Sequence, residues 1–207
     1  MGVNLVGAGG HAREIYYLSH EFGIEVNTFS EENPTKKHLE GRPVKDIKDI
    51  SKDEPCILAV GTPNRKRLVE LIGPNPIWYN HIAKSAIFES RHTNLSSKGI
   101  CIFPNCFVSG NIELGKFVYI NTGAQVHHDC VLGDFVSVGP RAVLCGNITV
   151  GDNTYIGAGA TIKNGVTIGK NVIVGMGAVV ISNLLDGTVY AGNPAKIINT
   201  KSGDAKL

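Results

Sequence analysis

The second half of the chain carries an aliphatic residue at every sixth position. Stepping by six from Ile102 to Val180, each position is Ile, Leu or Val. Four residues after each of these, from Cys106 to Leu184, stands a small or aliphatic residue, and a Gly directly follows the aliphatic position in seven of the fourteen hexads. A period of six fits neither the 3.6-residue turn of a helix nor a hairpin, but it fits a chain that turns one corner in each hexad.

These hexads predict a parallel β-helix. Short strands would run between the corners, the aliphatic residue of each hexad would point inward, and Gly or Asn would supply the unusual φ of each corner. Three hexads would close a triangular coil of about 18 residues, and stacked coils would bury a continuous aliphatic column. The alternative is a β-rich domain with an accidental period, and it is disfavoured because the repeat runs unbroken at two positions of each hexad.

The first eighty residues follow a different pattern, in which short apolar runs alternate with helical ones. Val3–Gly7 is an apolar run, followed by a Gly-rich turn and a helical spacing of apolar residues from Ile15 to Phe22. A second run, Cys56–Gly61, precedes a predicted helix at Arg65–Ile72. Both loops would lie at the carboxyl edge of one parallel sheet. We therefore expect a small α/β domain, half of a Rossmann fold, with room for a mononucleotide but not for a full dinucleotide.

The Gly-rich turn has the spacing of a phosphate-binding loop. Gly7, Gly9 and Ala12 satisfy G-x-G-x-x-A, and Glu31 and Glu32 follow at about the distance expected for a ribose or base contact. Such a turn lets backbone N–H groups at a helix N-terminus approach phosphate oxygens. The motif alone does not distinguish a phosphate-binding loop from a tight turn that binds no ligand.

Charge separates the two parts and excludes several classes of function. Only eight of the 38 charged residues lie between Ile100 and Leu184. We expect an α/β domain at 1–81, the β-helix at 82–200 and a tail at 201–207. The net charge is +2 without a run of Lys and Arg, which argues against nucleic acid as a partner. No stretch approaches the ~20 apolar residues of a membrane span, and the first residues lack the features of a secretion signal, so we expect a cytoplasmic protein.

One corner of the repeat carries a pair of histidines. In the segment Val126-His127-His128-Asp129-Cys130 the first and last residues are inward positions of the hexads, so the three polar residues between them occupy a corner. Histidine titrates near neutral pH, and an adjacent carboxylate fixes its tautomer and raises its basicity. Outside a repeat, a pair of ordinary surface histidines would be the simpler interpretation.

The five cysteines indicate neither a disulfide framework nor a metal site. No CxxC occurs, and Cys106 and Cys130 fall on inward positions, so they are expected to be buried in a reducing compartment. A cysteine nucleophile is disfavoured because no thiol has a His placed as its base, with Cys130 the one to check. No metal is expected, because the β-helix carbonic anhydrases present separated His ligands and this repeat has an adjacent pair.

The repeat resembles the left-handed β-helix of hexapeptide acyltransferases, and Gly192-Asn193-Pro194-Ala195-Lys196 is similar to the Gly-x-Pro-Ala-Lys segment that closes it. With GAGGHAR near the start, and Asn80-His81 and Ser85-Ala86 at the junction, the chain from about Val3 to Lys196 resembles one branch. That branch is the sialic acid O-acetyltransferase and UDP-4-amino-sugar N-acetyltransferase family of bacterial surface-glycan pathways. The resemblance implies a homotrimer that binds acetyl-CoA as co-substrate in the groove between neighbouring helices.

The resemblance also implies roles for individual residues. His128 would be the general base and Asp129 its orienting partner. Asn121, placed on the preceding coil, would lie near the sugar, and the Gly146 N–H, one coil above His128, would serve the thioester oxygen. The residues expected to bind the nucleotide sugar are Gly9, Gly10, His11, Glu31, Glu32, Gly61, Asn64 and Asn121. Those expected to bind acetyl-CoA are Ser137, Gly146, Ala158 and Met176.

Two positions are left open by the resemblance. Some relatives have a second His that contacts acetyl-CoA, and Ser137 stands in its place here. The role of His127 is also open.

The predicted function is an acetyl-CoA-dependent N-acetyltransferase of a nucleotide-linked 4-amino-sugar, with direct transfer. The alternatives are O-acetylation of a sialic acid and a non-catalytic β-helix scaffold, and neither the sugar nor the nucleotide base is defined.

Overall fold

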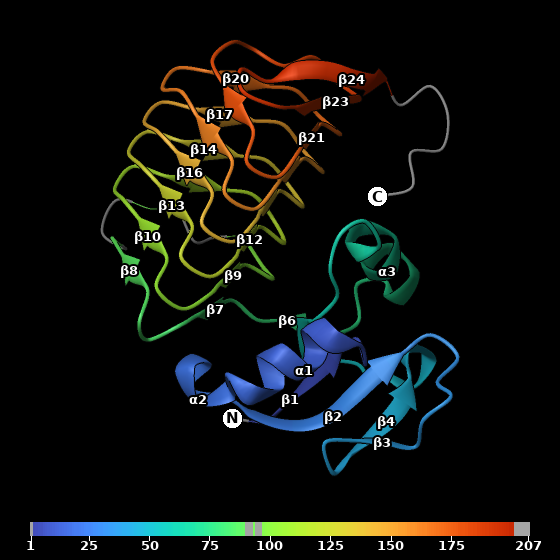
Figure 1. Ribbon diagram of the computed structural model, residues 1–207. Helices are drawn as coiled ribbons and strands as arrows, with labels where there is room; N and C mark the ends of the chain where they lie inside the picture. The colour runs from blue at the N-terminus through green and yellow to red at the C-terminus, as the bar shows by residue number, and fades with distance from the viewer. Residues whose placement is uncertain (1, 90–92, 94–96, 201–207) are drawn as a thin grey trace. The chain divides into compact units, whose positions relative to one another are not determined.

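The computed structural model describes residues 2–89, 93 and 97–200 of the chain (Figure 1). The chain divides into two compact units, Met1–Lys84 and Ser85–Leu207. The predicted tail at 201–207 lies outside the described residues. Within the described ranges no helix is long and apolar enough to cross a membrane.

The first unit is built on a mostly parallel sheet with the strand order β3-β4-β2-β1-β5-β6. Its elements in chain order are β1 (Gly2–Val6), α1 (Gly10–Tyr17), α2 (Ser19–Phe22), β2 (Glu25–Glu31), β3 (His38–Leu39), β4 (Arg42–Asp46), a 3₁₀ turn (Ile47–Asp49), β5 (Pro55–Leu58), α3 (Arg65–Ile72), β6 (Ile77–Trp78) and β7 (His81–Ile82). The apolar runs predicted as strands are the buried central strands β1 and β5, where Leu5 and Ile57 are almost fully enclosed. The predicted α/β domain is confirmed.

One strand departs from the expected parallel sheet. β3 pairs antiparallel with β4, and Leu39 lies opposite Arg42. The two residues between them, Glu40 and Gly41, both have positive φ, 49° and 73°. Such a two-residue connection has the backbone twist that antiparallel strands require. A strand of two residues is too short to produce an alternating pattern, so this hairpin could not be predicted from the hydrophobic pattern.

The second unit is a parallel β-helix whose short strands stack into three ladders (Figure 1). The first ladder contains β8 (Ile87–Phe88), β10 (Phe107–Val108), β13 (Gln125–Val126), β16 (Val143–Leu144), β19 (Thr161–Ile162) and β22 (Val179–Val180). The second contains β11 (Glu113–Leu114), β14 (Val131–Leu132), β17 (Thr149–Val150) and β20 (Thr167–Ile168). The third contains β9 (Cys101–Ile102), β12 (Tyr119–Ile120), β15 (Ser137–Val138), β18 (Tyr155–Ile156), β21 (Ile173–Val174), β23 (Thr188–Ala191) and the antiparallel β24 (Lys196–Thr200).

The register confirms the coil of three hexads. Tyr119 pairs with Ser137, and Gln125 with Val143, so each residue lies beside the one 18 positions further along. The aliphatic residue of each hexad points inward, as Leu132 shows with 1% of its surface exposed. The column that these residues fill is the core of the second unit.

The corners depend on a left-handed backbone that recurs every sixth residue. The residues with positive φ in this series are Gly99, Asn105, Asn111, Phe117, Gly123, Asp129, Phe135, Arg141, Asn147, Asn153, Gly159, Gly165, Asn171 and Gly177. The prediction of Gly or Asn is therefore incomplete, because Asp, Phe and Arg also occupy corners. A left-handed non-Gly residue costs roughly 1 kcal/mol, and stacking offsets part of that cost where corner side chains meet. The rings of Phe117 and Phe135, for example, stack with their centroids 5.0 Å apart.

We predict that shortening an inward residue destabilises the β-helix whereas shortening an exposed one does not. Leu132→Ala removes a side chain that is 1% exposed, and Leu185→Ala removes one that is 66% exposed. The first should lower the free energy of unfolding by about 3 kcal/mol and the second by less than about 0.5 kcal/mol. Denaturant unfolding followed by circular dichroism measures both. Equal losses would contradict the inward assignment of the aliphatic residue.

Candidate active site

His128 and Asp129 form the corner between β13 and β14. Val126 and Cys130, on either side, are fully buried. Asp129 has a φ of 60°, so it takes the left-handed position of this corner. The side chains of His128 and Asp129 are 66% and 48% exposed, and both can therefore contact a ligand on the outer surface of the triangular β-helix, or prism.

The two side chains of the corner are joined by a short polar contact. His128 Nδ1 lies 2.7 Å from Asp129 Oδ2. Hydrogen bonds from Asn111 and from His128 hold the pKa of Asp129 below its usual range, so its carboxylate is ionised at neutral pH. An ionised carboxylate accepts the Nδ1–H of the imidazole, which leaves the lone pair on Nε2. The corner thus presents a histidine in the tautomer that a general base requires.

Asn111 is part of this group, and the sequence interpretation missed it. Its Nδ2 donates to Asp129 Oδ1 at 2.5 Å. Asn111 stands 18 residues before Asp129, in the corresponding corner of the neighbouring coil, and it too has positive φ. Stepping back by one coil from Asp129 would have identified it.

Gly146 leaves the space that the His128 ring occupies. It lies one coil above His128, as the spacing predicts, and the neighbouring Asn147 N–H donates to His128 O at 2.8 Å. A Cβ atom at residue 146 would lie 2.5 Å from His128 Nε2 and still closer to Cε1. The sequence had suggested a role only for the Gly146 N–H, and the steric role of this glycine becomes clear only in the structure.

The other polar groups at this corner have different partners. The His127 ring packs at a tilt on Phe107, with centroids 5.4 Å apart. Cys130 Sγ donates to the backbone O of Cys145 at 3.2 Å. Burial raises the pKa of the Cys130 thiol, so it stays protonated at neutral pH and does not provide a thiolate nucleophile.

The remaining predicted residues of the β-helix lie away from this corner. Asn121, Ala158 and Met176 occupy corners between the third and first ladders, and Ser137 lies in β15. Asn121 belongs to the same coil as His128, one corner earlier, so its placement on the preceding coil was wrong. A spacing of seven residues covers little more than one of the three corners of an 18-residue coil. Within one chain the structure therefore places Ala158 and Met176 at one edge of the β-helix, Gly146 at another beside His128, and Ser137 buried in a strand.

Met176 is the most exposed of these side chains. Its relative exposure is 77%. The backbone before Ala158 and Met176 packs closely on the next coil. A Cβ at Gly157 would lie 2.6 Å from Met176 N, and one at Gly175 would lie 3.0 Å from Ala191 Cβ. The exposed Met176 side chain is therefore accessible to a ligand, as a contact with acetyl-CoA at this corner would require.

The glycines of the first unit fall into two groups. Gly7 has a φ of 135°, and a Cβ there would lie 2.8 Å from Val60 Cγ1, so the fold itself requires this glycine. Gly9, Gly10 and Gly61 have no atom within 4 Å of a Cβ position and no left-handed φ. Neither packing nor backbone conformation explains these three. Gly9 and Gly10 lie at the start of α1, and Gly61 lies in the loop between β5 and α3. Exposed glycine amides at the N-terminus of α1 favour a ligand over a mere tight turn.

The acidic pair after β2 is only partly open. Arg67 of α3 binds Glu32 with two nitrogens, at 2.8 and 2.9 Å, and this pair lowers the pKa of Glu32. Glu31 ends β2 beside it. The sequence offered no reason to choose Arg67 from its helix. Asn64 precedes α3 and makes no capping hydrogen bond through its side chain.

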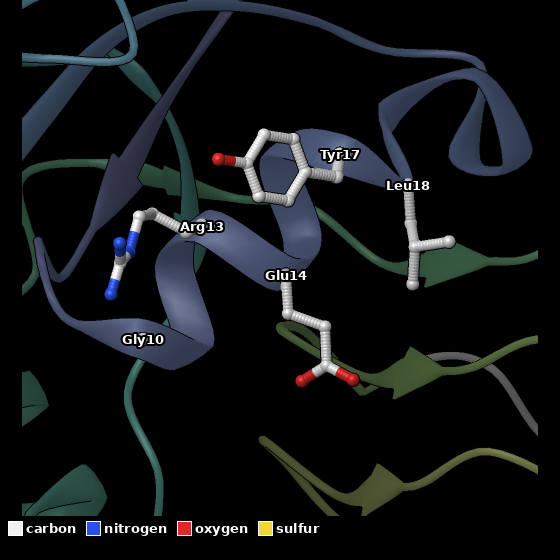
Figure 2. A pocket seen from close by; sticks show the side chains of 5 residues that line it. All are labelled: Gly10, Arg13, Glu14, Tyr17 and Leu18. Carbon is white, nitrogen blue, oxygen red and sulfur yellow. The ribbon is translucent and has the colours of Figure 1, made fainter.

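A hollow of about 440 Å³ opens along α1 from Gly10 (Figure 2). It is lined by Arg13, Glu14 and Tyr17 of α1 and by Leu18, the residue that follows the helix. His11 points its Nδ1 at Glu14 Oε2, 3.3 Å away, and burial lowers the pKa of His11. The hollow therefore begins at the predicted phosphate loop. In the described part of the chain, no three His, Cys, Asp or Glu side chains are grouped so as to hold a metal ion.

Comparison with known proteins places this geometry in a family. The model of bacterial transferase hexapeptide repeats matches residues 129–164 and 147–182. Perosamine N-acetyltransferase from Caulobacter crescentus, solved with CoA and GDP-perosamine, is 30% identical with a TM-score of 0.86, over 96% of this chain and 97% of that one. The acetyltransferase domain of PglB from Neisseria gonorrhoeae, solved with acetyl coenzyme A, is 28% identical with a TM-score of 0.83, over 95% and 98% of the two chains.

Two further matches extend the comparison. WeeI from Acinetobacter baumannii is 29% identical with a TM-score of 0.80, over 96% of this chain and 100% of that one. Uncharacterized protein L142 of Acanthamoeba polyphaga mimivirus is 31% identical over 137 residues, which are 64% of this chain and 24% of that protein. The chain therefore spans about a quarter of the length of this curated relative.

This chain belongs to the hexapeptide-repeat acyltransferases. It matches a sugar N-acetyltransferase over 96% of its length, and its repeats match the hexapeptide model. Within that family it closely matches the sugar N-acetyltransferases represented by the Caulobacter and Neisseria proteins, over nearly its full length. The resemblance stated from the sequence is confirmed.

We predict that Gly146→Ala displaces the His128 ring with little cost in stability. The new Cβ meets an exposed ring that can rotate away, whereas in Gly151→Ala the new Cβ would lie 2.7 Å from the backbone carbon of Gly169, which cannot move as easily. Crystal structures and thermal unfolding of both variants measure the effect. We expect a rotated His128 and a nearly unchanged midpoint in the first, and a lowered midpoint in the second. A His128 ring still paired with Asp129 in Gly146→Ala would contradict the steric role.

Proposed function

We propose that the protein transfers the acetyl group of acetyl-CoA to the amine of a nucleotide-linked 4-amino-sugar, in the synthesis of bacterial surface glycans. The observation that carries this proposal is the pairing of His128 Nδ1 with the ionised Asp129, at 2.7 Å. It orients an imidazole with Nε2 facing away from the carboxylate. The match to a protein solved with CoA and GDP-perosamine supports the choice of substrates.

The reaction needs a base and no covalent intermediate. The amine nitrogen attacks the thioester carbonyl carbon, the new C–N bond forms, and His128 Nε2 takes the proton that the nitrogen loses. Asp129 stabilises the imidazolium. The C–S bond then breaks, and the imidazolium returns its proton to the departing CoA thiolate. Binding both substrates together replaces a bimolecular encounter, and the protonated Cys130 leaves no thiolate to form an acyl-enzyme.

The first unit is proposed to bind the nucleotide diphosphate. Gly9 and Gly10 present backbone amides at the start of α1, where the helix dipole favours an anion. Gly61 and Asn64 would border the nucleotide from the other loop, and His11 would lie on the sugar side. Glu31 and the Arg67-bound Glu32 would contact the ribose or base.

Acetyl-CoA is proposed to bind along the β-helix in a homotrimer. Ala158 and the exposed Met176 lie on a different edge of the β-helix from His128, and Ser137 lies in β15 with 3% of its surface exposed in the single chain. Two edges of one prism cannot both line a single groove, but edges of neighbouring prisms can. This arrangement gives a reason for the trimer, in which the groove between subunits would join Asn121 and the predicted CoA residues to His128 and Gly146.

The test is a panel of acceptors with a His128 variant. UDP-, GDP- and dTDP-4-amino-sugars and free and CMP-linked sialic acids are incubated with acetyl-CoA, thiol release is followed, and products are weighed by mass spectrometry. We expect one 4-amino-sugar nucleotide to gain one acetyl group on nitrogen. His128→Asn should lower kcat by about 10²-fold to 10⁴-fold because the base is lost. His20→Asn, which changes an exposed histidine of the first unit, should leave kcat unchanged.

Three results would contradict the proposal in different ways. Acetylation of a sialic acid hydroxyl would replace the amine by an oxygen acceptor. Absence of transfer to every acceptor would favour a non-catalytic scaffold. Near-normal kcat in His128→Asn with acetyl-CoA bound would remove His128 as the base.

A further inference from the structure

The hydrogen bond of Asn111 to Asp129 completes a chain of three side chains that ends at His128. Asn111 Nδ2 donates to Asp129 Oδ1 at 2.5 Å, and Asp129 Oδ2 lies 2.7 Å from His128 Nδ1. Each carboxylate oxygen thus has one partner, and the two partners come from adjacent coils. The carboxylate is held from both sides.

Without Asn111 the carboxylate would have freedom to turn. The Asp129 side chain is 48% exposed, so water competes for both of its oxygens. Exposed charge pairs gain little from their attraction and lose side-chain entropy when they order. A second, fixed donor reduces that loss because it restricts the carboxylate before His128 is engaged.

The left-handed backbone of the corner is enough to explain why residue 111 is an asparagine. It does not explain why the side chain of Asn111 contacts Asp129. Asn111 has a φ of 58°, and asparagine tolerates the left-handed region. The same ladder of corner amides occurs elsewhere, where Asn153 Nδ2 donates to Asn171 Oδ1 at 2.8 Å. Among the described residues, no histidine hydrogen-bonds to the acceptor at that corner. The Asn111–Asp129 contact can therefore affect the histidine, whereas the Asn153–Asn171 contact only joins two corners.

We propose that Asn111 is a positioning residue that fixes Asp129 against His128 and thereby sets the tautomer of the base. The proposal rests on the function proposed above only for its effect on turnover. Its effect on the tautomer of His128 is independent of any substrate.

The variant that tests it is Asn111→Gly. Glycine accepts positive φ without strain, so the corner is kept and only the amide is removed. Asn111→Asp is the second variant, because it keeps the shape and tolerates the same φ but replaces the donor by a carboxylate that repels Asp129. The matched control is Asn171→Gly, which breaks the equivalent contact with Asn153 at the other corner.

Three measurements are made on each variant. In ¹⁵N-histidine protein, NMR reads the imidazole nitrogens of His128, assigned by the loss of its signals in His128→Asn. Steady-state kinetics gives kcat and the KM for acetyl-CoA. Thermal unfolding shows whether the fold is retained.

We expect Asn111→Gly and Asn111→Asp to shift His128 from the Nδ1–H toward the Nε2–H form and to lower kcat about tenfold, with KM for acetyl-CoA unchanged. Combining Asn111→Gly with Asp129→Gly should reduce kcat no further than Asp129→Gly alone, because Asn111 acts through Asp129. Asn171→Gly alone should change neither the tautomer of His128 nor kcat. Added to Asp129→Gly, it should leave kcat as it is in Asp129→Gly.

An unchanged His128 tautomer in a folded Asn111→Gly protein would overturn the proposal, as would losses that add in the double variant. If the wild-type protein acetylates no acceptor, the proposed function fails, and the NMR measurement alone decides the role of Asn111.

Discussion

The register of 18 residues between successive coils decides which side chains can meet. Parallel ladders fix it, since each strand hydrogen-bonds to the strand one coil later, as Gln125 does beside Val143. The core side chains stack in the same register, so a slip of one residue would turn buried aliphatic residues outward. The corner residues follow it too. Asn111, Asp129 and Asn147 therefore form one column, and the position of His128 beside Gly146 follows directly from it.

The column provides geometry rather than stability. The side chains of His128 and Asp129 are 66% and 48% exposed, so water competes for both groups and their hydrogen bond adds little to the free energy of folding. The free energy that holds the corner comes from the buried aliphatic column behind it, represented by Val126 and Leu144. The scaffold can therefore afford an open polar corner, and a small change in hydrogen bonding there alters the chemistry without unfolding the prism. Positioned donors act in this way in other active sites.

Much of the fold could be predicted because the hexad pattern is periodic and each period has one physical cause. Strand positions, inward residues and the height of Gly146 over His128 all follow from counting. The assignment of Asn121 to the preceding coil was a miscount, because seven residues span little more than one corner of an 18-residue coil. The other features that the sequence did not predict depended on local geometry that counting does not contain. The β3–β4 hairpin needs two residues with positive φ, and the Glu32–Arg67 pair joins segments 35 residues apart. The Asn111 contact follows from the coil register but carries no chemical signature of its own, because asparagine is also an ordinary corner residue.

In the proposed reaction His128 Nε2 is the atom that takes the proton from the sugar amine. A crystal structure of the protein with CoA and the 4-amino-sugar nucleotide that it acetylates tests this most directly. We expect the amine nitrogen within about 3 Å of His128 Nε2, with Asp129 still on Nδ1 and the nucleotide diphosphate against the amides of Gly9 and Gly10. An amine that lies beside another side chain, with His128 turned away from it, would exclude His128 as the base.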